Sequence, residues 1–146
     1  MASPVPTRVG IARLSAQEVD LPPGVWTDIP VEVNLPWPGT YILDANVRGR
    51  LVGIAPVNAF ITARLWDATA GTAVANSERL VYQSIGDTGT GQGSGNGTAP
   101  ISEVLSVNAP TTIWLQALQT EAFGAALVAQ IYSDATGFTS LRYVLP

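Results

Sequence analysis

The sequence predicts an all-β protein, and two observations lead to that prediction. Residues 41–51 alternate between apolar or glycine residues at the odd positions and mostly polar or charged residues at the even positions. Successive side chains of a strand point to opposite faces of a sheet, so this pattern indicates a half-buried strand. Similar short runs recur along the chain between turn residues, and no window of roughly 11 residues or more shows a helical period.

The candidate strands follow one another in chain order at residues 7–14, 25–33, 41–51, 59–67, 72–82, 101–107, 112–120, 126–134 and 138–145. Pro30 interrupts the second of them, and because proline cannot donate to a strand ladder we expect an edge or a bulge there. Gly71 supplies a positive φ for a turn, which predicts a hairpin between the fourth and fifth strands. We expect roughly eight to ten strands, in a sandwich or a barrel.

Two segments lack the strand pattern. Residues 1–8 contain prolines and indicate an extended N-terminal arm, which either lies on a neighbouring molecule or is a frayed end. Its candidate partner-binding residues are Pro4, Val5, Pro6 and Arg8. Residues 86–97 alternate glycine with small polar residues, which predicts a flexible loop. We therefore expect an arm over residues 1–8 and one domain over residues 9–146 that carries this loop.

The chain is poor in charge. Only 12% of its residues are charged, against about 25% in ordinary domains. The net charge is −4, and the seven basic residues are scattered arginines. Nucleic acid and anionic membrane surfaces call for clustered positive charge, so we expect neither as a partner. No apolar run reaches the ~20 residues of a membrane span, and we see no signal peptide. A surface with so little charge predicts contacts with other subunits, the alternative being a monomer with a neutral polar surface.

The missing side chains exclude most enzyme chemistry. Without histidine, cysteine or lysine, the chain has no usual general base, no activated thiol and no Schiff-base amine. Histidine-liganded metal sites are excluded as well, and the glycine stretch lacks the pattern of a calcium or phosphate loop. Carboxylate chemistry of the glycosidase kind remains, but most of the acids lie in turns or on polar strand faces. We expect no catalytic residue, no cofactor and no metal.

Three tryptophans are candidate partner-binding residues. Trp66 and Trp114 share their strand faces with polar neighbours, and Trp37 stands between two prolines in a turn. Exposed aromatic side chains stack on sugars or anchor a protein partner. The other interpretation is packing in the core or between subunits, and the sequence favours it.

Three segments carry a resemblance to a known family. They are the Pro-Gly-Thr-Tyr turn at residues 38–41, the Asn-Ala-Pro-Thr-Thr strand that starts at Asn108, and the final strand at residues 137–143. Residues 25–146 are thereby similar to the compact jelly rolls of the tumour-necrosis-factor and complement type. They also resemble the small jelly-roll proteins of tailed-phage particles. The resemblance implies an antiparallel β-sandwich of jelly-roll topology, a homotrimer and no catalysis. Abundant Ala, Gly and Arg without lysine fit a GC-rich genome, such as that of an actinobacterial phage.

These observations predict a non-catalytic structural virion protein of a tailed bacteriophage. We expect a trimeric capsid decoration protein that stabilises the head, with itself and the major capsid protein as partners. It would be located in the virion after assembly in the host cytoplasm. One alternative is a minor tail or fibre-tip protein that binds a host-surface glycan. Two further alternatives are a carboxylate-based glycan hydrolase and a secreted binding module of the complement type.

Overall fold

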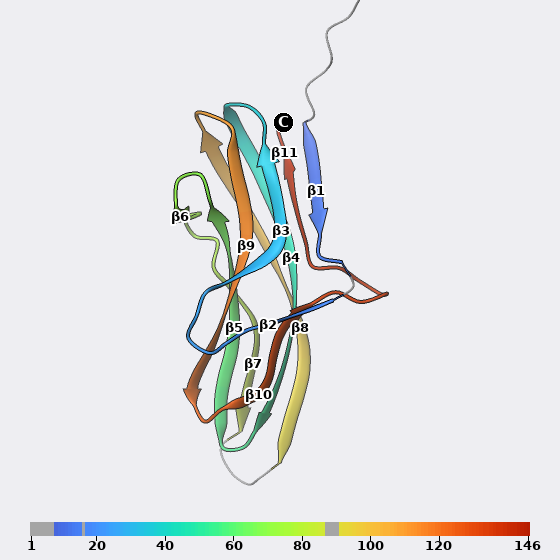
Figure 1. Ribbon diagram of the computed structural model, residues 1–146. Coiled ribbons are helices and arrows are strands. Elements are labelled where there is room, and N and C mark those ends of the chain that lie inside the picture. Colours follow the sequence, from blue (N-terminus) through green and yellow to red (C-terminus); the bar gives the residue numbers. More distant parts are fainter. Residues whose placement is uncertain (1–7, 16, 87–90) are drawn as a thin grey trace, which may run out of the picture.

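A computed structural model of the chain describes residues 8–15, 17–86 and 91–146. These residues form two antiparallel sheets that pack face to face, with the long strands running along the long axis of the molecule (Figure 1). The predicted all-β, antiparallel sandwich is therefore confirmed. The strands are β1 (Val9–Arg13), β2 (Glu18–Asp20), β3 (Thr27–Leu35), β4 (Gly39–Ile54), β5 (Val57–Asp67), β6 (Thr72–Ala73), β7 (Arg79–Gly86), β8 (Gln92–Val107), β9 (Thr111–Phe123), β10 (Ala126–Tyr132) and β11 (Ser140–Val144).

The two sheets contain six and five strands, but each has only four strand positions, since two short strands can share one position. In the first sheet, β4 pairs with β8 on one side and with β11 and β10, one after the other, on its other side. The outermost position is shared by β1, which pairs with β11, and β2, which pairs with β10. The second sheet runs β3–β9–β5, and both β6 and β7 pair with the far side of β5. Eight strand positions in two such sheets are the arrangement of a jelly roll.

The core lies between the sheets, and β4 shows how the sequence builds it. The apolar odd-numbered residues of β4, among them Tyr41, Leu43 and Val47, are buried. They form one cluster with Ile61 of β5, Ile113 of β9 and other buried side chains of the second sheet. The period of two in the sequence thus separates a buried face from an outer face, as the pleat of a strand requires.

Pro30 lies in a bulge on an edge strand, as its sequence position predicts. The register between β3 and β9 shifts between Ile29 and Glu32, and β3 is at the edge of its sheet. The predicted turn at Gly71 is also present, with a φ of 72°. It joins β5 to the short strand β6, and β7 resumes the pairing with β5 after residues 74–78.

The predicted flexible loop over residues 86–97 is wrong for its second half. Residues 92–97 are the first six residues of β8 and pair in register with β4, while residues 87–90 lie outside the described residues. Gly97 and Gly95 pair with buried positions of β4, on the side that packs against β7. A Cβ on Gly97 would collide with the carbonyl oxygen of Val81, and one on Gly95 with the ring of Tyr82. These glycines allow a close approach of two strands.

Candidate functional site

Two of the predicted tryptophans lie next to each other on the outer face of the second sheet. Trp66 of β5 and Trp114 of β9 are direct cross-strand partners, and both side chains are half-buried. Glu32 of β3 continues the row, where its Oε2 accepts a hydrogen bond of 2.6 Å from Nε1 of Trp114. The row therefore crosses three strands, with a carboxylate at one end and two indole rings beside it.

A second row lies beside the first and holds an arginine between aromatic rings. The Cζ atom of Arg64 lies 3.8 Å from the ring centroid of Trp26 and 5.1 Å from that of Trp66. Its Nε donates a 3.0 Å hydrogen bond to Gln116, whose Nε2 donates one of 2.8 Å to Asp28. The attraction between a guanidinium and the face of an indole ring adds to these hydrogen bonds and fixes the side chains. We call Trp26, Arg64, Trp66 and Trp114 the tryptophan face.

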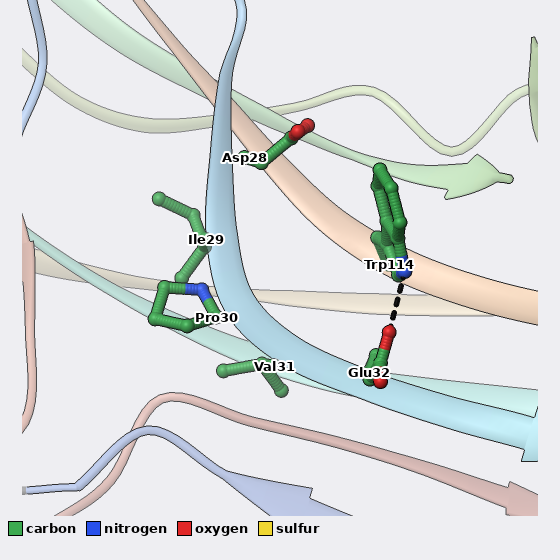
Figure 2. A pocket seen from close by; sticks show the side chains of 6 residues that line it. All are labelled: Asp28, Ile29, Pro30, Val31, Glu32 and Trp114. Atoms are coloured by element: carbon green, nitrogen blue, oxygen red, sulfur yellow. Dashed lines mark hydrogen bonds between the residues drawn. The ribbon is translucent and has the colours of Figure 1, made fainter.

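A hollow of about 390 Å³ adjoins the tryptophan face. The bulge of β3 produces it. Three residues of β3 point outward here, Asp28, Pro30 and Glu32, but only two residues of β9 lie opposite them, Gln116 and Trp114. Figure 2 shows the two carboxylates on β3 and the indole of Trp114 standing beside them on β9. We call this the β3 hollow; it is lined by Asp28, Ile29, Pro30, Val31, Glu32 and Trp114.

The other predicted site residues lie elsewhere. Trp37 is in the turn between β3 and β4 with 37% of its surface exposed, and the hydroxyl of Tyr41 bridges its backbone N–H and C=O. Arg8 donates hydrogen bonds to the carbonyl oxygens of Leu145 and Pro146, so it is held against the last two residues of its own chain. The predicted arm residues Pro4, Val5 and Pro6 lie outside the described residues.

Sequence reasoning missed Trp26, Arg64 and Gln116. One local signal was available, because Arg64 and Trp66 are two residues apart on a strand and must share a face. Nothing local indicates that Trp26, which precedes β3, stacks on the same guanidinium. That contact depends on the register of β3 against β9 and of β9 against β5.

The outer face of the first sheet carries a different surface, an apolar row across all four strand positions. Val9 pairs with Val144, Val144 with Ile42, and Ile42 with Val104. Val9 is 54% exposed and Val104 is 64% exposed. We call these four residues the valine row.

Three arginines on this face are paired with acids of the same chain, Arg142 beside the valine row and Arg48 and Arg50 farther along β4. Arg142 lies 3.4 Å from Asp44, Arg50 lies 3.0 Å from Glu18, and Arg48 lies 2.9 Å from Asp134. The Arg48 guanidinium, followed by the hydroxyl and backbone N–H of Thr136, holds the pKa of Asp134 well below its ordinary value. The hydrogen bond to Asp134 in turn raises the pKa of Arg48.

Burial raises the pKa of Tyr143 above that of a free phenol, with a smaller contribution from Tyr41.

Among residues 8–15, 17–86 and 91–146, no three acidic side chains come together in a group that could hold a metal ion. The described strands and turns include no helix of the length and apolarity that a membrane crossing requires.

No family model matches the chain, and no curated protein matches its sequence. Among solved structures, the chain is similar to the Gt strain of infectious bursal disease virus (TM-score 0.54) and to the VP2 subviral particle of that virus (TM-score 0.52). Both matches are 18% identical and cover 94% of this chain. The chain has a jelly-roll fold.

The jelly roll spans about a third of the length of the virus chains that it matches, 33% in the first and 32% in the second. A further match, to the Eiger tumour necrosis factor of S. frugiperda, has a TM-score of 0.42, 10% identity and 96% coverage of this chain. The predicted jelly-roll topology is confirmed by the strand order and by the two virus structures.

Proposed function

We propose that this protein is a non-catalytic structural protein of a virus particle, and that it decorates the capsid of a tailed bacteriophage as a homotrimer. The observation that carries the proposal is the likeness, over 94% of the chain, to a virus structure and to a subviral particle. A fold by itself is compatible with many functions. The absence of histidine, cysteine and lysine adds support, because it removes the usual catalytic side chains.

The valine row is the face that we assign to self-association. Exposed apolar patches on a chain of this size mark contact surfaces, and this row extends across the whole width of the first sheet. The arginines Arg48, Arg50 and Arg142 on the same face are neutralised by acids of the same chain. At the valine row itself the charges of Arg142 and Asp44 offset each other, so two copies of the row can approach without strong repulsion between like charges.

The major capsid protein is the partner that we assign to the other contacts. A standard interface buries about 1,600 Å², and repetition over a symmetric shell turns modest contacts into strong binding. The arm at residues 1–8, with Pro4, Val5 and Pro6, is the segment that we expect to lie on the capsid. Arg8 anchors its inner end to the last residues of the domain.

The test is the copy number of this chain in purified particles, measured by mass spectrometry against the major capsid protein. A number close to that of the capsid protein, or a simple fraction of it, is expected for a decoration protein. A handful of copies would instead place the protein in the tail. Absence from the particle would overturn the virion proposal.

A glycan hydrolase is the catalytic alternative, and it requires two carboxyl groups poised on either side of a glycosidic bond. The two carboxylates at the β3 hollow are instead hydrogen-bonded to their neighbours, Asp28 to Gln116 and Glu32 to Trp114. We expect no release of reducing sugars from host cell walls treated with the purified protein. Release that stops in both Asp28→Asn and Glu32→Gln variants would contradict the non-catalytic proposal.

A further inference from the structure

We propose that the tryptophan face and the β3 hollow together bind a neutral glycan. Trp114 and Trp66 would stack on the sugar rings, and the carboxylates of the hollow would accept hydrogen bonds from sugar hydroxyl groups. This goes beyond the structural role proposed above and does not depend on it, since a particle protein can carry such a site on a capsid or on a tail.

The arrangement of the two indole rings fits a chain of sugar rings. Trp114 and Trp66 stand side by side on neighbouring strands of a sheet face. From Glu32 on β3 to Trp66 on β5 the row covers two strand spacings, about 10 Å. The C–H faces of a pyranose are apolar, and its edge carries hydroxyl groups. In this row the indole rings can stack on the sugar faces and the carboxylate can accept hydrogen bonds from the hydroxyl groups.

The carboxylates at the hollow have hydrogen-bonding capacity to spare. Asp28 accepts the hydrogen bond from Gln116 on Oδ1, and Glu32 accepts the one from Trp114 on Oε2. Within the described part of the chain, no side chain donates a hydrogen bond to the other oxygen of either group. An ionised carboxylate only accepts, and the hydroxyl groups of a sugar supply donors. The volume of the hollow, about 390 Å³, lies in the range typical of small-ligand sites.

The charges of the face favour a neutral ligand over an acidic one. Its one arginine, Arg64, is already stacked between Trp26 and Trp66 and hydrogen-bonded to Gln116. The carboxylates of Asp28 and Glu32 would repel the carboxylate of an acidic sugar. Because these side chains are held by one another before any ligand arrives, binding would order few rotamers and lose little entropy.

The experiment is a titration of the purified full-length chain with soluble neutral oligosaccharides: cellotetraose, maltotetraose and the tetramer of N-acetylglucosamine. Intrinsic tryptophan fluorescence reports binding directly, because Trp26, Trp66 and Trp114 belong to the site. We expect a saturable change with at least one of the three probes. Trp114→Ala should weaken that binding about tenfold or more. Glu32→Gln changes the shape of the surface less, and it should also weaken binding because it removes a carboxylate. Trp37→Phe is the matched control and should bind like the wild type.

Three outcomes would overturn the proposal. The first is no saturable signal with any of the probes up to about 10 mM, a concentration at which a site with a dissociation constant of about 1 mM is mostly occupied. The second is equal binding by the wild type and by folded Trp114→Ala and Glu32→Gln variants. The third is a lower assembly mass for Trp114→Ala in light scattering, which would make this face a contact between copies of the chain. The first two outcomes leave the proposed structural role untouched. The third would move the contact between copies from the valine row to this face, and none of the three bears on the copy number in the particle.

Discussion

At the scale of single residues, Arg48 ties one connection to the first sheet. Its guanidinium donates hydrogen bonds to Asp134 and to the hydroxyl of Tyr132, and it lies 4.6 Å from the centroid of the Tyr132 ring. Asp134 also accepts hydrogen bonds from the backbone N–H and the hydroxyl of Thr136. The segment between β10 and β11 is therefore held on β4 by this ion pair, by a hydrogen bond from the Arg48 guanidinium to the carbonyl oxygen of Gly137, and by one from the Arg48 backbone N–H to the hydroxyl of Thr139.

Replacement of Asp134 by Asn should change how stability depends on pH. The pKa of Asp134 is depressed in the folded state, so its charged form stabilises the fold above the ordinary aspartate value of about 3.9. That contribution is lost as the pH falls through the folded-state value. We expect the difference in unfolding free energy between wild type and Asp134→Asn to be constant from about pH 7 to pH 5 and to shrink below about pH 4.

Urea unfolding at a series of pH values measures this difference. Glu78→Gln is the control, because Glu78 is an exposed acid, and its difference from the wild type should change little over the same range. A difference for Asp134→Asn that stayed constant down to pH 3 would contradict the assigned ion pair.

At the scale of elements, the first half of β8 shows why a glycine-rich segment can be a strand. Gly97 has no room for a side chain, because the carbonyl oxygen of Val81 on β7 occupies the position of its Cβ. Gly93 in the same strand has its nearest neighbour, Oγ of Ser84, at an ordinary contact distance of 3.5 Å. The two glycines thus stand between similar small or polar residues in one strand but have different surroundings.

We predict that Gly97→Ala destabilises the protein and that Gly93→Ala does not. The added methyl group at residue 97 must push two strands apart, which should lower the unfolding free energy by about 2 kcal/mol. At residue 93 the alanine fits and restricts the unfolded chain, so stability should change by less than about 1 kcal/mol, in the stabilising direction. Urea unfolding of both variants checks this, and equal losses in the two would show that β7 does not pack on β8 as described.

At the scale of the whole molecule, the two outer faces are assigned different tasks. The face of the first sheet carries the valine row and charges that are paired within the chain. The face of the second sheet carries the tryptophan face and the β3 hollow. A jelly roll can present two such surfaces at once, because its core lies between the sheets and leaves both outer faces free.

Val104→Arg should prevent self-association. Light scattering coupled to size-exclusion chromatography should give about three times the chain mass of 15.3 kDa for the wild type and the single-chain mass for the variant, since a subunit contact would have to bury the new charge. Leu80→Arg is the control: Leu80 is 55% exposed and pairs with β5 in the second sheet. This variant should keep the mass of the wild type. A wild type of single-chain mass would contradict the homotrimer.

Features that depend on neighbouring residues could be predicted from the sequence. The alternation over residues 41–51 predicted a half-buried strand, and Pro30 predicted an edge or a bulge because it lacks an N–H. Gly71 predicted a turn through its positive φ. Composition alone excluded catalysis by histidine, cysteine or lysine side chains. Each of these follows from the backbone geometry or the side-chain chemistry of a single short segment.

Features that depend on which segments meet could not be predicted from the sequence and follow from the packing of the folded chain. Residues 92–97 have the composition of a loop, yet they are a strand because β4 pairs with them and β7 fills the space that their missing side chains leave. The predicted tryptophans Trp66 and Trp114 lie side by side only because the register of β9 against β5 pairs them. Trp26 joined them through Arg64. Strand register is set by packing between segments distant in sequence, and short-range patterns carry no information about it.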